Sequence, residues 1–269
     1  MQRISLTRWP EGKTHALTFS YDDGQRHDIR LIEILDAYGL KGTFHLNSGN
    51  LERENCVQRD ELGTIYANHE ISTHTVNHPV LTQQPDAQVL DEFLEDRKQL
   101  EAASGRVIRG MSYPFGSYDA RVIDIARAAG LAYGRTVRSH GGYGLPEDWL
   151  AWHPTCHDRG ATLEKGAEFL EPARWGMMKL MYVWGHSFEF PQQNRWESFD
   201  AFCALMGQHP NAIWAATNID VVEYVTAQRR LIFSAERTLV SNPSSIPVWI
   251  TVNDTTLEVP AGTVDMATG

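Results

Sequence analysis

The sequence predicts an α/β protein built on parallel strands. Short apolar segments rich in strand-forming residues alternate with segments whose apolar residues recur at helical spacing, and a glycine follows each helical segment. Polar residues suited to chemistry follow several of the predicted strands, which is where α/β folds place their active sites. With 269 residues and 42% hydrophobic content, the chain can bury one large core.

The predicted elements begin with a strand, a helix and a second strand. Residues 16–21 alternate and are rich in strand formers, residues 28–38 carry apolar side chains at helical spacing, and residues 42–47 again suit a strand. Further strands are predicted at residues 70–73, from residue 107, at residues 131–137 and at residues 181–186, and further helices at residues 86–103 and 120–129. This repetition favours parallel strands with helices outside them.

The pattern changes in the last part of the chain. Residues 231–235, 248–252 and 256–259 resemble short strands, separated by Asn-Pro and Asn-Asp turns. We therefore expect one large domain over residues 1–230 and a small β-rich extension over residues 231–269.

Two adjacent carboxylates, Asp22 and Asp23, follow the first strand and precede Gly24. Neighbouring carboxylates repel each other unless they do different jobs, for example when a cation neutralises one and the other stays free as a base. For this motif alone, a solvated Asp-Gly turn is the alternative, because both residues are ordinary in turns.

A histidine pair, His74 and His78, follows the strand at residues 70–73. On one helical turn, this spacing points both imidazoles the same way. Two imidazoles and one carboxylate suit zinc, iron or cobalt better than magnesium or calcium, and three protein ligands leave room for water. The pair and the earlier aspartates together favour a metal site over two structural histidines.

Two later motifs supply a cation and a proton donor. Arg109 precedes a Tyr-Pro-Phe-Gly turn, and an arginine can hold a carboxylate ionised and oriented through a bidentate pair. A surface arginine before a turn is the alternative. His186 ends the apolar strand at residues 181–186, and a histidine with an ordinary pKa can protonate a leaving amine or alkoxide at neutral pH.

In this order, the motifs resemble those of the polysaccharide deacetylases of the NodB-homology group, carbohydrate esterase family four. The resemblance runs from the first aspartate pair to the last histidine, about two-thirds of the sequence, and implies a distorted (β/α) barrel similar to a TIM barrel. It implies that Asp22 is the general base, that Arg109 orients it, and that Asp23, His74 and His78 bind the metal.

The same resemblance assigns residues around the leaving group. Tyr113 would lend its backbone N–H to the oxyanion, His186 would be the general acid, and Asp148 would tune that acid. Trp149 would wall the acyl pocket. Trp184 belongs to an aromatic group near these motifs, and we place it in the substrate pocket because sugar rings pack on aromatic faces. Leucine three residues before Asp148, where the family often has aspartate, indicates a divergent branch.

We therefore expect a metal-dependent hydrolase that removes acetyl groups from a poly- or oligosaccharide through a metal-activated water. N-acetyl groups, held by a carbon–nitrogen bond that is not a peptide bond, are the expected target, and O-acetyl groups stay open. Zinc is the expected metal, with cobalt, nickel or iron as candidates. The alternatives are a catalytically weak carbohydrate-binding relic of the same fold and a non-haem iron oxygenase, which the strand and helix alternation disfavours.

Composition limits the partners. The formal net charge of −10 argues against binding to nucleic acid or an anionic membrane. Without a transmembrane-length apolar run or a secretory segment, the given chain reads as cytoplasmic, and as secreted if a signal was trimmed. The three cysteines indicate neither a disulfide framework nor a thiolate zinc site. The sugar and the oligomeric state are not indicated.

Overall fold

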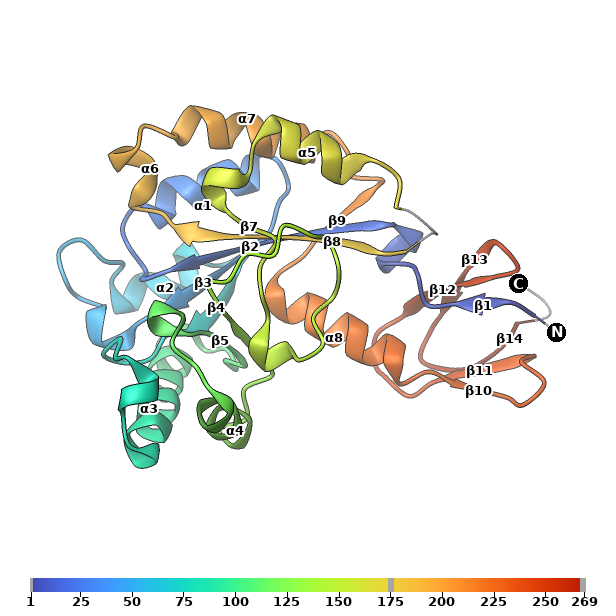
Figure 1. The fold of residues 1–269 in the computed structure, drawn as a ribbon, viewed down its shortest axis with the longest axis horizontal. Coiled ribbons are helices and arrows are strands. Elements are labelled where there is room, and N and C mark those ends of the chain that lie inside the picture. Colours follow the sequence, from blue (N-terminus) through green and yellow to red (C-terminus); the bar gives the residue numbers. More distant parts are fainter. Residues whose placement is uncertain (1, 174–176, 267–269) are drawn as a thin grey trace.

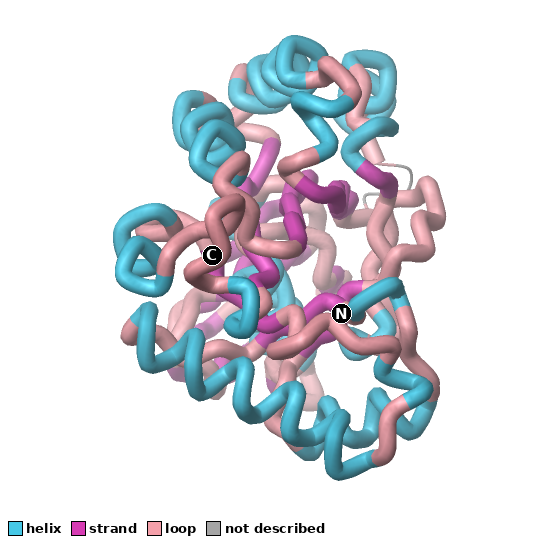
Figure 2. Tube along the Cα trace, turned by 90° about the vertical axis from the view of Figure 1, so that its left-hand side faces the viewer, coloured by secondary structure: helices cyan, strands magenta, loops and turns pink. Residues whose placement is uncertain are grey.

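The computed structural model describes residues 2–173 and 177–266. An eight-stranded sheet, parallel throughout, curls into a half-barrel with helices packed against it, and two small three-stranded sheets lie at one end (Figure 1). Seen from the side, the strands lie in the middle of the molecule with helices around them (Figure 2). The α/β class and the distorted (β/α) barrel are thus confirmed.

The central strand of the large sheet is β2 (His15–Asp22), which is buried along its whole length. One edge of β2 pairs throughout with β8 (Lys179–His186). The other edge pairs first with β9 (Ile213–Ala215) and then with β3 (Gly42–Leu46). Although the β2 sequence alternates between apolar and polar residues, strands on both edges and packing over its faces bury the polar side chains as well.

The remaining elements of the half-barrel continue this alternation. The other strands are β4 (Glu70–Thr73), β5 (Gly110–Ser112), β6 (Tyr133–Arg135) and β7 (Cys156–His157). The helices are α1 (Asp28–Ala37), α2 (Leu62–Ile65), α3 (Asp86–Ser104), α4 (Ala120–Ala128), α5 (Leu163–Leu170), α6 (Glu189–Gln192), α7 (Trp196–Gly207) and α8 (Asn218–Arg229). The helices predicted at residues 28–38, 86–103 and 120–129 are confirmed, whereas β6 is shorter than the predicted strand.

Local sequence explains where the long helices start and stop. The side chain of Asp119 caps α4 by accepting a hydrogen bond from the Val122 N–H at 2.8 Å. Gly105 ends α3 with a φ of 69°, a left-handed conformation that costs glycine little. On α1, the buried Leu31, Ile32 and Leu35 form the face that packs on the core.

Residues 74–78 do not form the predicted helical turn. Thr75 and His78 have φ values of 67° and 54°, so the backbone turns left-handed twice and cannot continue as a helix. The Asn47 side chain supports this loop by donating hydrogen bonds to the carbonyls of His74 and Thr75 at 2.5 and 2.9 Å. The two imidazoles still meet, with ring centroids 4.7 Å apart.

The two small sheets are antiparallel. One contains β1 (Ile4–Ser5), β12 (Val248–Val252) and β13 (Thr255–Val259), and the other contains β10 (Ile232–Phe233), β11 (Leu239–Asn242) and β14 (Gly262–Asp265). The three strands predicted here are present, and β1, β11 and β14 are additional. Residues 267–269 of the predicted extension lie outside the described residues. None of the described helices is both long and apolar enough to span a membrane.

Candidate active site

The candidate site lies at the carboxyl ends of the parallel strands. At the end of β2, Asp22 is in register with His45 on β3 and with His186 on β8. At the end of β5, Ser112 is in register with Arg135 on β6. Since parallel strands end at the same rim of the sheet, motifs far apart in the sequence meet here.

The backbone gives the two adjacent aspartates different environments. Asp22 is the last residue of β2 and is 3% exposed. Asp23 follows in a left-handed conformation with a φ of 79°, and its N–H donates to the His45 carbonyl at 3.0 Å. This turn leaves Asp22 in the core and brings the Asp23 carboxylate to the surface of the site.

Asp23, His74 and His78 form a set of possible metal ligands. The Nε2 atoms of His74 and His78 lie 3.8 and 4.0 Å from Asp23 Oδ1, and the three ligand atoms are all within 4.8 Å of one another. Zinc ligands at about 2.0–2.2 Å from the metal in tetrahedral geometry stand roughly 3.3 Å apart, so small side-chain adjustments suffice.

The surroundings of His74 fit a metal ligand. Its Nδ1 lies 2.8 Å from the carbonyl oxygen of Ser112, so an Nδ1–H that donates there leaves the Nε2 lone pair free. Burial lowers the pKa of His74, which favours the neutral, ligating form. The donor set of two imidazoles and one carboxylate therefore suits a divalent cation such as zinc.

Asp22 stands beside this set without belonging to it. Its Oδ1 accepts a hydrogen bond from Ser112 Oγ at 2.9 Å, and its Oδ2 pairs with the guanidinium of Arg135 and lies 3.9 Å from His74 Nε2. Burial would raise the pKa of Asp22, but attraction by Arg135, and then by His74 and His186, outweighs burial and holds the pKa far below its usual range. Asp22 is therefore a buried carboxylate that stays ionised.

The prediction that Arg109 orients Asp22 is wrong. Arg109 precedes β5, about 10 Å from the carboxyl end of that strand at about 3.3 Å per residue, and it pairs with Glu223 on α8. Arg135 takes the expected role because it ends the neighbouring strand, is fully buried, and lies over the ring of Trp184 at 4.6 Å. The sequence signal that could have identified Arg135 was a single arginine within an otherwise apolar predicted strand.

The Tyr113 N–H does not face the site. It donates to the carbonyl of Arg135 at 3.0 Å and so continues the ladder between β5 and β6, which leaves it unavailable to an oxyanion. The next turn instead presents Phe115, which is 66% exposed and has a left-handed φ of 56°. Its ring meets the His78 imidazole edge-on, with centroids 4.4 Å apart.

His186 lies beside Asp22 on the neighbouring strand β8, and it has a carboxylate partner. Its Nε2 lies 3.9 Å from Asp22 Oδ2, and its Nδ1 lies 3.1 Å from Glu189 Oε1. Burial would raise the pKa of Glu189, but the hydrogen bond from Arg159, at 2.8 Å, helps to hold it below the usual value. An ionised Glu189 thus accepts the Nδ1–H and leaves Nε2 directed to the site.

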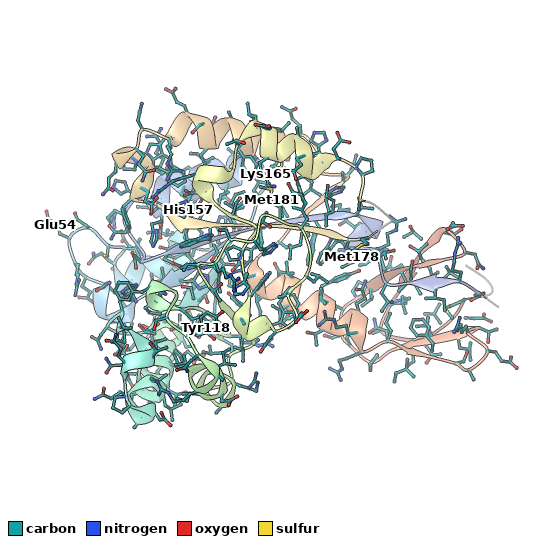
Figure 3. All side chains as sticks on the ribbon, in the orientation of Figure 1. Glu54, Tyr118, His157, Lys165, Met178 and Met181 are labelled. Carbon is teal, nitrogen blue, oxygen red and sulfur yellow. The ribbon has the colours of Figure 1, made fainter. Side chains whose placement is uncertain are left out.

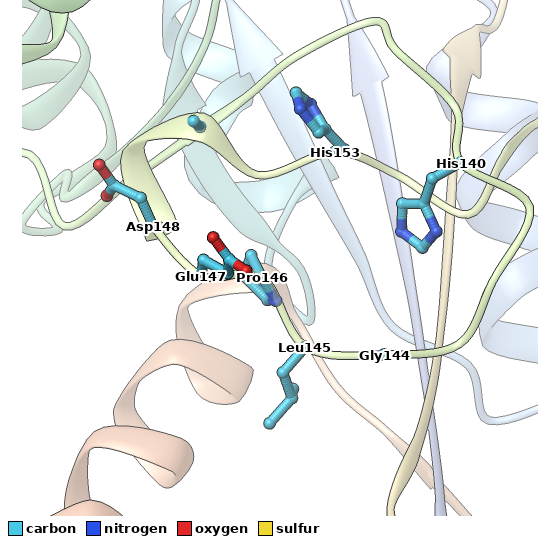
Figure 4. Close-up of a pocket in the computed structure, with 8 residues that line it drawn as sticks. His140, Gly144, Leu145, Pro146, Glu147, Asp148 and His153 are labelled. Atoms are coloured by element: carbon cyan, nitrogen blue, oxygen red, sulfur yellow. The ribbon is translucent and has the colours of Figure 1, made fainter.

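Asp148 is not the partner of His186, contrary to the prediction. Asp148 caps the turn that begins at Trp149 by accepting from the Leu150 N–H at 2.9 Å, and it lies 3.6 Å from Arg127 on α4. It lines a cavity of about 460 Å³ in the loop between β6 and β7 (Figure 4). This loop runs back alongside β6, where the Trp152 N–H donates to the Gly134 carbonyl, and so Asp148 lies away from β8.

The two predicted pocket tryptophans have different surroundings. Trp149 packs edge-on against Trp152, with ring centroids 4.8 Å apart, in the apolar cluster that includes α8 and the small sheets. It therefore does not wall the site. Trp184 is 9% exposed and lies between the guanidinium of Arg135 and the ring of His157, which puts it within the wall of the site.

The fold and the site together define a class, the half-barrel hydrolases whose chemistry lies at the carboxyl rim of a parallel sheet. Residues 8–134 match the family model described as Polysaccharide deacetylase. This part of the chain, just under half of it, is similar to the polysaccharide deacetylase family, as the order of the motifs predicts, and the enzymes it resembles are hydrolases that act on carbon–nitrogen bonds other than peptide bonds.

Known proteins agree with this assignment. A chitin deacetylase from Amylomyces rouxii is 31% identical over 129 residues, or 47% of this chain and 29% of that protein. A peptidoglycan-N-acetylglucosamine deacetylase from Listeria monocytogenes is 24% identical over 125 residues, or 45% of this chain and 26% of that protein. The matches thus span less than a third of these relatives. A candidate polysaccharide deacetylase from Mycobacterium smegmatis shares the fold, with a TM-score of 0.62 and 18% identity over 84% of this chain and 96% of that chain.

Proposed function

We propose that this protein is a metal-dependent deacetylase that removes N-acetyl groups from an acetylated poly- or oligosaccharide, with O-acetyl groups as a second target. The observation that carries the proposal is that a buried carboxylate and a set of possible metal ligands lie side by side at the carboxyl ends of the strands. Asp22 is buried, ionised and unligated, and it lies 3.9 Å from a histidine of the possible metal set. One carboxylate as base beside a cation-holding set is an arrangement suited to hydrolysis of an acyl group by a metal-activated water.

Asp23, His74 and His78 would hold the divalent cation. Zinc is the cation we expect, with cobalt, nickel or iron as candidates, because imidazole-rich sets suit these metals. A cation bound there lowers the pKa of a water molecule and polarises the acetyl carbonyl.

The chain's own residues carry the proton transfers. Asp22 accepts the proton of the attacking water, and Ser112 and Arg135 hold its two oxygens so that the carboxylate is oriented and charged. His186, whose Nδ1–H is held by Glu189, gives the proton on Nε2 to the departing amine nitrogen as the carbon–nitrogen bond breaks. The products are acetate and a free amine on the sugar.

The surface around these residues suits a glycan. Phe115 exposes an aromatic face beside His78, and sugar rings pack on such faces. A polar hollow of about 440 Å³ adjoins the segments that follow Asp23 and His186. It is lined by Gln25, Arg26, His27, Asn55, Phe188 and Gln192. Amide side chains beside one aromatic ring are suited to sugar hydroxyl groups.

Acetate release from N-acetylglucosamine oligomers tests the proposal. We expect release by the wild-type protein, loss of release in Asp22→Asn, and loss on chelation that added zinc reverses. Asp148→Asn is the matched control and should keep wild-type release, because this carboxylate pairs with Arg127 away from the site. Acetate release that survives both Asp22→Asn and chelation would defeat the proposal, and sugar binding without any release would favour the relic.

A further inference from the structure

A second group of ligand-type side chains lies next to the first. His157 ends β7, His186 ends β8 and Glu189 begins α6, and one ligand atom from each lies within 4.8 Å of the other two. Glu189 Oε1 is 3.1 Å from His186 Nδ1 and 3.6 Å from His157 Nε2. His157 is labelled in Figure 3, where it lies at the end of the half-barrel near α6.

We propose that His157, His186 and Glu189 form a second, weaker site for a divalent cation such as zinc, and that filling it removes His186 from catalysis. The binding part stands on the geometry of these residues alone. The inhibitory part rests on the proposed deacetylase function.

The neighbours of His157 orient it as a ligand. Its Nδ1 accepts a hydrogen bond from the Arg159 N–H at 3.3 Å and lies 2.8 Å from Oδ1 of Asp158, a buried carboxylate that Arg195 also holds at 2.9 Å. When Nε2 ligates a cation, the ring proton stands on Nδ1, and Asp158 is close enough to accept a hydrogen bond from it there, which is the usual support of a metal-binding imidazole. Here Nε2 is directed towards Glu189.

Glu189 offers one oxygen to the site and uses the other for support. Its Oε2 is held by Arg159 Nη2 at 2.8 Å and by Arg195 Nη2 at 3.5 Å, so Oε1 alone faces the two imidazoles. The ring of Trp184 packs edge-on against both imidazoles, with centroids 4.8 Å from His157 and 5.9 Å from His186. The three ligand atoms therefore approach one point with little freedom to move.

The local charge predicts the order of filling. Around the second group, the charges of Asp158 and Glu189 are offset by the two arginines. Around the first group, Asp22 and Asp23 face one arginine among the described residues, so one negative charge remains. An extra unit charge at about 4 Å favours a cation by roughly tenfold or more, and the first site should fill first.

Binding at the second site changes what His186 can do. The cation binds the lone pair on Nδ1 of His186. The proton on Nδ1, which had been hydrogen-bonded to Glu189, is released to solvent. The ring then keeps one proton, on Nε2, and cannot gain the second proton that makes it an imidazolium acid. Acetate release should therefore rise as the first site fills and fall as the second one fills.

Zinc stoichiometry of the full chain tests the site directly. By equilibrium dialysis with metal analysis, we expect two equivalents in the wild type, the second bound at least about tenfold more weakly. His157→Gln should bind one equivalent, and the matched control His209→Gln, a histidine on the turn after α7, should bind two. Arg159→Gln should tighten the second equivalent because it removes a positive charge from Glu189.

A second readout separates this inference from the proposed function. Excess zinc should inhibit acetate release by the wild type and leave release by His157→Gln unchanged. A single equivalent in the wild type, or two in His157→Gln, would overturn the site. If His157→Gln fails to fold, Arg159→Gln provides the test, and a second zinc equivalent bound there with wild-type affinity would overturn the site. Two equivalents without acetate release from any sugar would sustain the site and defeat the deacetylase proposal.

Discussion

The ion pair between Arg135 and Asp22 gives the sharpest prediction. Arg135 is fully buried and Asp22 is 3% exposed, so Arg135→Gln leaves a carboxylate charge without a cation in the protein interior. Removing one partner of such a pair costs about 3–5 kcal/mol of unfolding free energy. In a chain of this size each kcal/mol shifts Tm by about 2–4 °C, so we expect Tm to fall by about 6–20 °C.

The matched control is Arg109→Gln, at the arginine that the sequence first suggested. Arg109 and Glu223 have side chains 43% and 46% exposed, and exposed pairs contribute about 0–1 kcal/mol. Its Tm should change by at most about 4 °C, and its rate of acetate release should equal that of the wild type.

Thermal unfolding and acetate release together measure the effect. Without the guanidinium, burial dominates and the pKa of Asp22 rises, so Arg135→Gln should also lose activity at neutral pH. Asp22→Asn combined with Arg135→Gln removes both charges and should recover part of the lost stability. If Arg135→Gln lowers Tm no more than Arg109→Gln does, or if the two changes are additive, the argument for a buried pair is refuted.

Three further predictions concern single side chains. Glu189→Gln removes the charge that holds His186, and kcat should fall about tenfold or more with KM nearly unchanged, whereas an equal rise in KM would contradict a positioning role. Burial raises the pKa of Asp28 to about 7 from 3.8, so its stabilising contribution is present below pH 3.8 and is lost as the pH rises through about 7. The unfolding free energy of Asp28→Asn, relative to that of the wild type, should therefore rise by up to about 4 kcal/mol between acid pH and pH 8. Urea unfolding at several pH values measures it, and a difference between the two proteins that does not change with pH would refute this. Phe115→Ala should raise KM for sugar oligomers with little change in Tm, because the ring is 66% exposed, and an unchanged KM would argue against a sugar-packing role.

The sequence located the rim of the sheet because polar residues stand directly after apolar strands. Asp22, Asp23, His74 and His186 each come at or just after the end of a predicted strand, and parallel strands bring such ends together. That rule needs no knowledge of which strands are neighbours, and for this reason it succeeded across more than 160 residues of chain.

The contacts that particular side chains make across the rim were harder to predict. Arg135 reaches Asp22 because β6 curls towards the barrel interior, and no local pattern in residues 131–137 contains that curvature. Similarly, Glu189 lies one turn beyond His186 in the chain and becomes its partner only because α6 begins there. The order of family motifs indicated Asp148 as the partner instead, but Asp148 lies on the loop that runs beside β6, away from His186.

The pairing of β1 with β12 ties the beginning of the chain to its last strands. Ile4 and Ser5 bond to Val252 and Thr251, and Trp9 is buried in the apolar cluster that these sheets share with α8. We therefore propose that residues 231–266 are an inseparable part of the barrel's end, so that truncation near residue 230 should yield aggregated protein. Both described ends of the chain lie opposite the catalytic rim (Figure 1). Immobilising the protein through either end should therefore leave the site accessible to an insoluble polysaccharide.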